Sequence, residues 1–149
     1  MASGVRFPPA APKNEPLKSQ KDYKEENVPN NRLVLIIEDD KVVALTQRHC
    51  LEDEGVEVLW ANTIETARQI LKERAKEISL IILDACLQSD KPNSMVLIPE
   101  ARNNGFNGII IASSGNDEYS QTLLRAGANY KSDKVDTPKM ALLVLKNIE

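Results

Sequence analysis

The sequence predicts an α/β fold in which helices cover both faces of a parallel sheet. Short apolar runs of strand length alternate along the chain with stretches whose apolar residues have helical spacing. Several of these runs are apolar throughout, which is typical of strands buried on both faces of a parallel sheet. With 149 residues, 42% of them hydrophobic, the chain is long enough for one domain with a hydrophobic core.

The first part of the pattern predicts three strands and two helices. Asp40 is suited to cap the first helix at its N-terminus, and Gly55 is suited to end it. Thr63 is a suitable N-cap for the second helix. The expected strands are residues 33–37, 56–61 and 80–83, and the expected helices are residues 41–54 and 64–76.

The second part predicts two more strands and three more helices. Pro99 falls within the first of these helices and should kink or shorten it if it lies beyond the first turn. Gly105 and Gly127 follow helical stretches, and Pro138 stands at the start of the last one. The expected helices are residues 95–103, 117–126 and 137–147, and the expected strands are residues 108–112 and 129–132.

The first 31 residues differ in composition from the rest. They hold five of the eight prolines, interleaved with Lys and Glu, and little periodic apolar content. Such a segment buries too little surface to offset the entropy lost on ordering. We therefore expect a disordered tail at residues 1–31 and a folded domain at residues 32–149.

The bulk composition excludes several classes of protein. The formal net charge of −3 does not favour binding to nucleic acid. Cys50 and Cys86 are too few for a disulfide framework. No apolar run reaches the ~20 residues that span a membrane, and the N-terminus lacks the pattern of a signal peptide. These features predict a soluble cytoplasmic protein.

Chemically active side chains follow the predicted strands where each one ends. Glu38 and Asp39 follow the first strand, Asp84 follows the third, Ser113 stands at the end of the fourth, and Lys134 follows the fifth. Ligands of open parallel sheets bind at the carboxyl ends of the strands. We therefore expect these five side chains to form one site.

The chemistry of this set favours a phosphoryl group and a divalent cation. Mg²⁺ prefers carboxylate and water oxygens, which Asp39 and Asp84 would supply, with Glu38 acting directly or through water. An ionised aspartate beside such an ion can attack phosphorus and form an acyl phosphate. Lys134 and Ser113 would each contact an oxygen of the phosphoryl group.

The segment from Arg32 to Ile148 resembles the receiver domain of two-component response regulators. The matching stretches are LVLIIEDDK, LIILDACL, GIIIASSG and AGANYKSDK, in the order and spacing of that family. The resemblance implies a chemotaxis-receiver-like, flavodoxin-like (βα)₅ fold with strand order 2-1-3-4-5. That strand order is the one known for flavodoxin and the chemotaxis receiver, and only the resemblance implies it here.

The resemblance also implies a role for each residue of the site. Asp84 would be the phosphoacceptor, Glu38 and Asp39 the acidic pair for Mg²⁺, Ser113 the switch hydroxyl, and Lys134 the conserved-type lysine. The phosphoryl donor would be a histidine kinase or a histidine phosphotransfer protein. The expected function is that of a single-domain receiver that signals by protein–protein contact with a downstream protein or by phosphorelay, and is not an enzyme in the usual sense.

Three positions depart from the family pattern. Val135 follows Lys134 where the family usually has proline, often after a cis bond, and a cis bond before a non-proline residue costs about 2.5–4 kcal/mol. The switch aromatic should fall at Lys131, whereas Tyr130 is one residue early. Gln88 occupies a position that is often proline. One alternative therefore stays open, a degenerate receiver that binds partners without phosphorylation. Independently of these positions, a fragment of a hybrid kinase also stays open.

Overall fold

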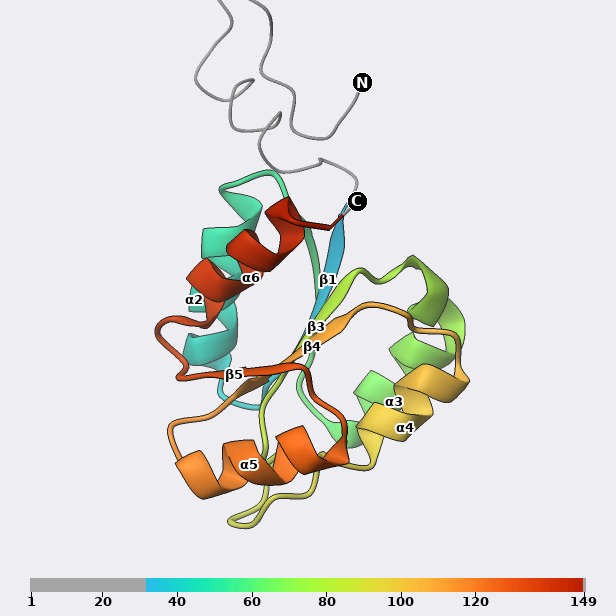
Figure 1. Cartoon of the computed structure of the whole chain (residues 1–149), viewed down its shortest axis with the longest axis vertical. Helices are drawn as coiled ribbons and strands as arrows, with labels where there is room; N and C mark the ends of the chain where they lie inside the picture. Colours follow the sequence, from blue (N-terminus) through green and yellow to red (C-terminus); the bar gives the residue numbers. More distant parts are fainter. Residues whose placement is uncertain (1–31, 149) are drawn as a thin grey trace, which may run out of the picture.

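The structure is a computed structural model that describes residues 32–148, so the expected tail at residues 1–31 lies outside the described residues. Five strands form one sheet in the order β2-β1-β3-β4-β5, and every neighbouring pair is parallel (Figure 1). The strands are β1 (Leu33–Ile37), β2 (Glu57–Ala61), β3 (Leu80–Leu83), β4 (Ile109–Ser113) and β5 (Tyr130–Ser132). The predicted fold class and strand order are confirmed.

Helices cover both faces of the sheet. Helices α2 and α6 lie on one face, and α3, α4 and α5 lie on the other (Figure 1). The helices are α2 (Lys41–Glu52), α3 (Ile64–Arg74), α4 (Leu97–Asn103), α5 (Asp117–Ala126) and α6 (Thr137–Lys146), and a short 3₁₀ turn, η1 (Ala75–Glu77), follows α3. None of the helices in this part of the chain has the length and apolarity needed to cross a bilayer.

The apolar strands separate two hydrophobic cores. Leu35 and Ile37 of β1 point into the core beneath α3, α4 and α5, whereas Val34 and Ile36 point into the core beneath α2 and α6. All four are at most 1% exposed. Because side chains alternate between the faces of a strand, a run without polar residues is required to fill both cores. Each such side chain contributes about 1.5–3 kcal/mol of burial free energy.

Helix ends differ from the predicted ends by a few residues. Helix α2 ends at Glu52, two residues early, because the chain turns through Gly55 with a φ of 85°. Helix α4 begins at Leu97, which makes Pro99 its third residue. The N–H groups of a first helical turn have no partner within the helix, so proline is tolerated there and does not kink it.

Two predicted N-caps have the expected geometry. The Asp40 side chain accepts hydrogen bonds from the N–H groups of Val42 and Val43 at 2.9 and 3.2 Å. The Thr63 hydroxyl accepts one from the N–H of Thr66 at 3.0 Å. Asp40 therefore caps α2 and stands apart from the acidic cluster described next.

Candidate functional site

The carboxyl ends of β1 and β3 bring three acidic side chains together. Glu38 and Asp39 directly follow β1, and Asp84 follows β3, its neighbour in the sheet. Carboxylate oxygens of these three residues lie within 4.8 Å of one another. Glu38 is 1% exposed and Asp84 is 6% exposed, so two of the three acids are withdrawn from water.

The ammonium group of Lys134 reaches this cluster from the loop between β5 and α6. Its Nζ lies 2.5 Å from Glu38 Oε1 and 3.0 Å from Asp84 Oδ1. The structure therefore brings together all four charged residues that the strand-end pattern singles out. The positive charge next to the buried acids in this structure belongs to a lysine.

Burial shifts the acid–base equilibria of these groups. Desolvation raises the pKa of Glu38 to about 7, against the lowering effect of Lys134, and the negative charge of Asp84 adds to the rise. Desolvation also raises the pKa of Asp84. For Lys134, burial acts to lower the pKa, but the hydrogen bonds and charges of Glu38 and Asp84 outweigh it and raise the pKa. Glu38 and Asp84 therefore bind protons more tightly than exposed acids would.

Asp39 is held by the backbone of the loop after β3. Its Oδ2 accepts a hydrogen bond from the N–H of Gln88 at 2.6 Å. Burial acts to raise the pKa of Asp39, but this bond, with further hydrogen bonds in the cluster, lowers it. Asp39 therefore remains ionised next to two acids whose pKa values are raised.

Two side chains that the sequence did not single out hold the loop between β3 and α4 in place. Asn93 accepts from the N–H of Leu87 at 2.7 Å and donates to the Leu87 carbonyl at 2.9 Å. The buried hydroxyl of Ser94 donates to the carbonyl of Asp84 at 2.6 Å. This loop presents the Gln88 N–H to Asp39, and φ of Gln88 is 55°.

Ser113 lies at the end of β4, but its hydroxyl contacts Thr137 and Gln47 and not the acidic side chains. It is fully buried and lies 2.9 Å from Thr137 Oγ1 and 3.3 Å from Gln47 Nε2. Gln47 also donates to the carbonyl of Lys134 at 3.2 Å. The signal for Gln47 was present in the sequence, since it stands between Ala44 and Leu51 on the apolar face of α2.

The structure shows the backbone geometry at the two places near β5 where the sequence departs from the family pattern, Val135 and Lys131. No cis peptide bond occurs among residues 32–148, so the Lys134–Val135 bond is trans. Lys131 pairs with Ala112 across the β4–β5 ladder, and Tyr130 pairs with Ile111, so no shift in register brings Tyr130 to the position of the switch aromatic. Instead, the Lys131 ammonium lies 2.6 Å from Asp117 at the start of α5.

The donor set of the cluster fits a divalent cation such as Mg²⁺. Three carboxylates facing one ammonium leave two negative charges in excess when all are ionised. Oxygen ligands at this spacing are those that a hard divalent cation prefers. Glu38, Asp39 and Asp84 would therefore hold the ion.

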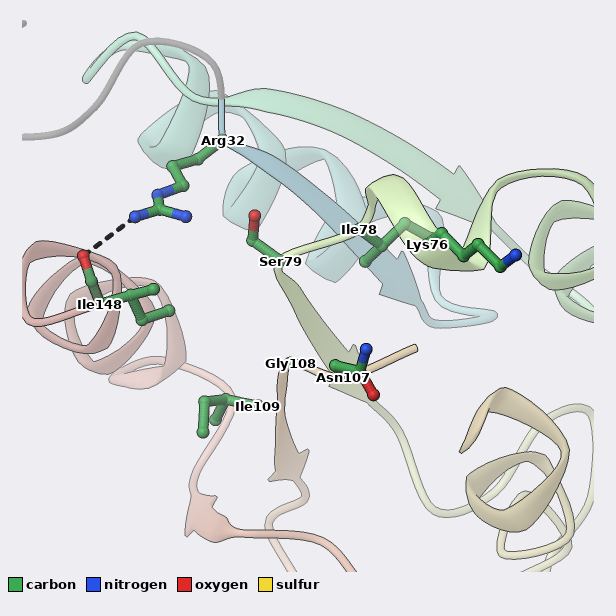
Figure 2. Close-up of a pocket in the computed structure, with 8 residues that line it drawn as sticks. All are labelled: Arg32, Lys76, Ile78, Ser79, Asn107, Gly108, Ile109 and Ile148. Atoms are coloured by element: carbon green, nitrogen blue, oxygen red, sulfur yellow. Dashed lines mark hydrogen bonds between the residues drawn. The ribbon is translucent and has the colours of Figure 1, made fainter. Parts of the chain in front are cut away.

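A separate hollow lies at the opposite, amino-terminal edge of the sheet (Figure 2). It measures about 350 Å³ and is lined by residues that precede or begin β1, β3 and β4, among them Arg32, Ser79 and Gly108. The Arg32 guanidinium donates to the carbonyl of Ile148 at 2.9 Å, which joins the residue before β1 to the segment that follows the last helix (Figure 2). None of the acids lines this hollow.

The fold and the acidic rim together define a receiver of the kind found in two-component systems. Residues 34–139 match the response regulator receiver domain family, and the chain belongs to that family. The transcriptional regulatory protein AruR of Pseudomonas aeruginosa is 30% identical over 119 residues, which cover 77% of this chain and 48% of AruR. The chain thus spans about half the length of that relative.

Solved receiver structures share the fold. A CheY-like response regulator receiver domain protein from Methanospirillum hungatei is 26% identical, with a TM-score of 0.61 over 77% of this chain and 90% of that one. A response regulator protein from Burkholderia pseudomallei, solved with a phosphorylated aspartic acid, a calcium ion and citrate, is 21% identical. Its TM-score is 0.66 over 78% of this chain and 67% of that one.

Proposed function

We propose that this receiver accepts a phosphoryl group on Asp84 from a phosphohistidine of a histidine kinase or a histidine phosphotransfer protein. The observation that carries the proposal is the meeting of three carboxylates and the Lys134 ammonium at the carboxyl rim of the sheet. Asp84 follows β3, the middle strand of the sheet, and its Oδ1 lies 3.0 Å from the Nζ of Lys134. The phosphorylated aspartic acid of the Burkholderia pseudomallei protein, which has the same fold, supports this choice.

The transfer exchanges one bond to phosphorus for another. A carboxylate oxygen of Asp84 forms a bond to phosphorus, and the bond from phosphorus to the imidazole nitrogen of the donor breaks. The electron pair stays with that nitrogen, and the ring, protonated on its other nitrogen, leaves as neutral imidazole. Lys134, which is already within 3.0 Å of Asp84, stabilises the charge on the phosphoryl oxygens.

Mg²⁺ is the proposed cofactor, held by Glu38, Asp39 and Asp84. When bound, it neutralises negative charge on the phosphoryl group and on the acids. The hydrogen bond from Gln88 keeps Asp39 ionised and oriented for this purpose. Glu38, whose pKa is raised to about 7, would lose its proton when the ion binds.

The proposed output is contact with a downstream protein or onward transfer in a phosphorelay. The chain acts as a phosphoryl acceptor with slow self-catalysed hydrolysis and not as an enzyme that turns over a substrate. Two apolar side chains close to site residues in the sequence, Val42 of α2 and Val135 after Lys134, are 73% and 86% exposed and suit contact with a partner protein. The second candidate, a degenerate receiver, is favoured only by the departures at Lys131 and Val135.

Labelling with a small phosphodonor tests the proposal and separates the two candidates. The wild-type chain is incubated with acetyl phosphate, with Mg²⁺ and with EDTA, and the phosphorylated fraction is measured by intact-mass spectrometry. We expect Mg²⁺-dependent addition of one phosphoryl group, and none in Asp84→Asn. Labelling of Asp84→Asn at the wild-type rate would refute the assignment of Asp84, and no labelling of the wild type would favour the degenerate receiver.

A further inference from the structure

A buried cluster of uncharged polar side chains lies behind the acidic rim, between α2, β4 and α6. It consists of Gln47, Ser113 and Thr137, and each of them is at most 1% exposed. Polar groups this deeply buried are costly unless they are hydrogen-bonded. The way in which these three side chains are hydrogen-bonded therefore affects the energy of the neighbouring acidic site.

The directions of the hydrogen bonds follow from counting protons. Thr137 Oγ1 lies 2.6 Å from the carbonyl of Asp133, which accepts its single proton. The contact of 2.9 Å between the two hydroxyls must then be donated by Ser113. Gln47 Nε2 donates to Ser113 Oγ at 3.3 Å and to the Lys134 carbonyl at 3.2 Å. In this arrangement the only proton of Ser113 is committed to Thr137.

Ser113 nevertheless stands next to Asp84. Leu83 pairs with Ala112 in the β3–β4 ladder, so Asp84 and Ser113 are the next residues on neighbouring parallel strands. Their side chains are on the same face of the sheet because Ile82 and Ile111 both point into the core beneath α2 and α6. Neighbouring strands are about 4.8 Å apart, a distance that rotation about the Cα–Cβ bond of a serine can bridge.

The cluster leaves one polar atom without a partner. Gln47 Oε1 is buried and accepts no hydrogen bond from any group in residues 32–148. An unpaired buried acceptor destabilises the arrangement that contains it. The resting arrangement of Ser113 is thus held by two hydrogen bonds and weakened by one unpaired atom, which suits a group that has to change partners.

We propose that Gln47 and Thr137 are positioning residues that hold the Ser113 hydroxyl away from Asp84 until a phosphoryl group arrives. The inference rests on the proposed function and goes beyond it. Ser113 can donate to a phosphoryl oxygen only by giving up its bond to Thr137, because a hydroxyl has one proton. These two residues therefore set the fraction of molecules in which Ser113 is available, and the apparent affinity for a phosphoryl group scales with that fraction.

Beryllium fluoride, a non-covalent analogue of the phosphoryl group, measures this affinity. Binding in the presence of Mg²⁺ is followed by the fluorescence of Trp60, the one tryptophan of the chain, whose indole N–H donates to the carbonyl of Glu38 at 2.7 Å. Thr137→Val removes the acceptor of the Ser113 proton, and Gln47→Met removes the donor to Ser113. We expect each variant to bind about two- to tenfold more tightly than the wild type, the effect of losing one hydrogen bond. Ser120→Ala, which alters a buried serine of α5, is the control and should bind as the wild type does.

A double-mutant cycle with Ser113→Ala separates positioning from general loss of structure. If Thr137 and Gln47 act through Ser113, neither substitution tightens binding in the Ser113→Ala background. A gain that persists without the Ser113 hydroxyl overturns the inference, as does wild-type or weaker binding by both single variants. If the wild type itself binds no beryllium fluoride with Mg²⁺, the proposed function fails and the inference falls with it.

Discussion

At the scale of single residues, Glu38 is the side chain whose chemistry depends most on its surroundings. It is 1% exposed, it shares Lys134 with Asp84, and its Oε2 accepts from the N–H of Asp40 at 3.0 Å. Two hydrogen bonds do not compensate fully for the loss of water around a carboxylate, and its pKa rises to about 7. Glu38 therefore titrates near neutral pH, in the range where a bound cation would displace its proton.

Glu38→Gln should change how stability depends on pH in the absence of divalent cations. Because the folded-state pKa of about 7 lies above the ordinary value of 4.5, protonated Glu38 stabilises the fold, and this stabilisation is fully present below pH 4.5. This stabilisation is lost as the pH rises through 7, and the total loss is on the order of 3 kcal/mol. The variant imitates the protonated form and should lack this loss. Urea unfolding between pH 4.5 and 8.5 with EDTA checks this, and parallel curves for both proteins would contradict it.

Lys134→Ala should destabilise the fold unless a divalent cation is present. Removal of the ammonium leaves Glu38 and Asp84 buried without a positive partner, which typically costs about 3 kcal/mol or more. We expect Mg²⁺ to raise the melting temperature of this variant more than that of the wild type, because the ion replaces the missing charge.

Lys131→Ala provides a matched control for that experiment. Its ion pair with Asp117 is exposed, the two side chains being 44% and 73% accessible, and such pairs contribute at most about 1 kcal/mol. An equal loss of stability in the two lysine variants, or equal effects of Mg²⁺ on both, would show that Lys134 does not serve as the internal cation of the site.

At the scale of elements, β5 and the loop after β3 show how this chain departs from its family pattern. β5 has three residues, and Tyr130 is 48% exposed beside α6 while Lys131 pairs with Asp117 of α5. An aromatic side chain is therefore absent from the α5 side of this strand. In the loop after β3, Gln88 stands where the family often has proline. Proline would not fit there, because residue 88 has a φ of 55° and donates its N–H to Asp39.

Gln88→Pro should disrupt the loop and weaken Mg²⁺ binding. Proline fixes φ near −65° and has no N–H, so neither the backbone conformation nor the hydrogen bond to Asp39 can be kept. Gln88→Gly is the matched control, because glycine accepts a positive φ and retains the N–H. We expect the proline variant to lose about 2 kcal/mol or more of stability and the glycine variant to stay close to the wild type. Mg²⁺ titration followed by Trp60 fluorescence should rank them in the same order, and equal affinities would contradict the role of the Gln88 N–H.

At the scale of the whole molecule, the sheet separates the acidic rim from the opposite edge where the described chain begins and ends. Every residue of the candidate site lies between positions 38 and 137, and the acids come from the two central strands β1 and β3. Arg32 and Ile148 are joined at the other edge (Figure 2). All the residues assigned to the candidate site thus belong to the described residues 32–148.

Deletion of residues 1–31 should leave fold and labelling unchanged, as long as Arg32 is kept. The site residues all lie within the described part of the chain, and the bond from Arg32 to Ile148 closes the far edge of the sheet. We expect the shortened chain to have the wild-type melting temperature within about 2 °C, since the site contacts described above all lie within residues 32–148. It should also take up phosphoryl from acetyl phosphate at the wild-type rate, and a slower rate would assign residues 1–31 a part in the reaction.

Much of the fold follows from the sequence because its signals are local. Apolar runs such as that of β1 and caps such as Asp40 depend on neighbours a few residues away, and these elements were predicted within a few residues of their observed ends. The helix ends were predicted less exactly. The turn at Gly55 and the 3₁₀ turn after α3 each contain residues that the sequence predicts to be helical. The position of acids at strand ends also follows from the order of elements.

The sequence by itself determined the alternation of strands and helices and the rim at which Glu38, Asp39, Asp84 and Lys134 would meet. Tertiary structure alone decided the orientation of the Ser113 hydroxyl, the bond from Gln88 to Asp39, and the raised pKa of Glu38. The physical reason is that hydrogen bonds join residues 66 and 49 positions apart in the first two cases, and that desolvation by the whole fold acts in the third. Periodicity reports which face a side chain is on, but not which distant group it contacts there.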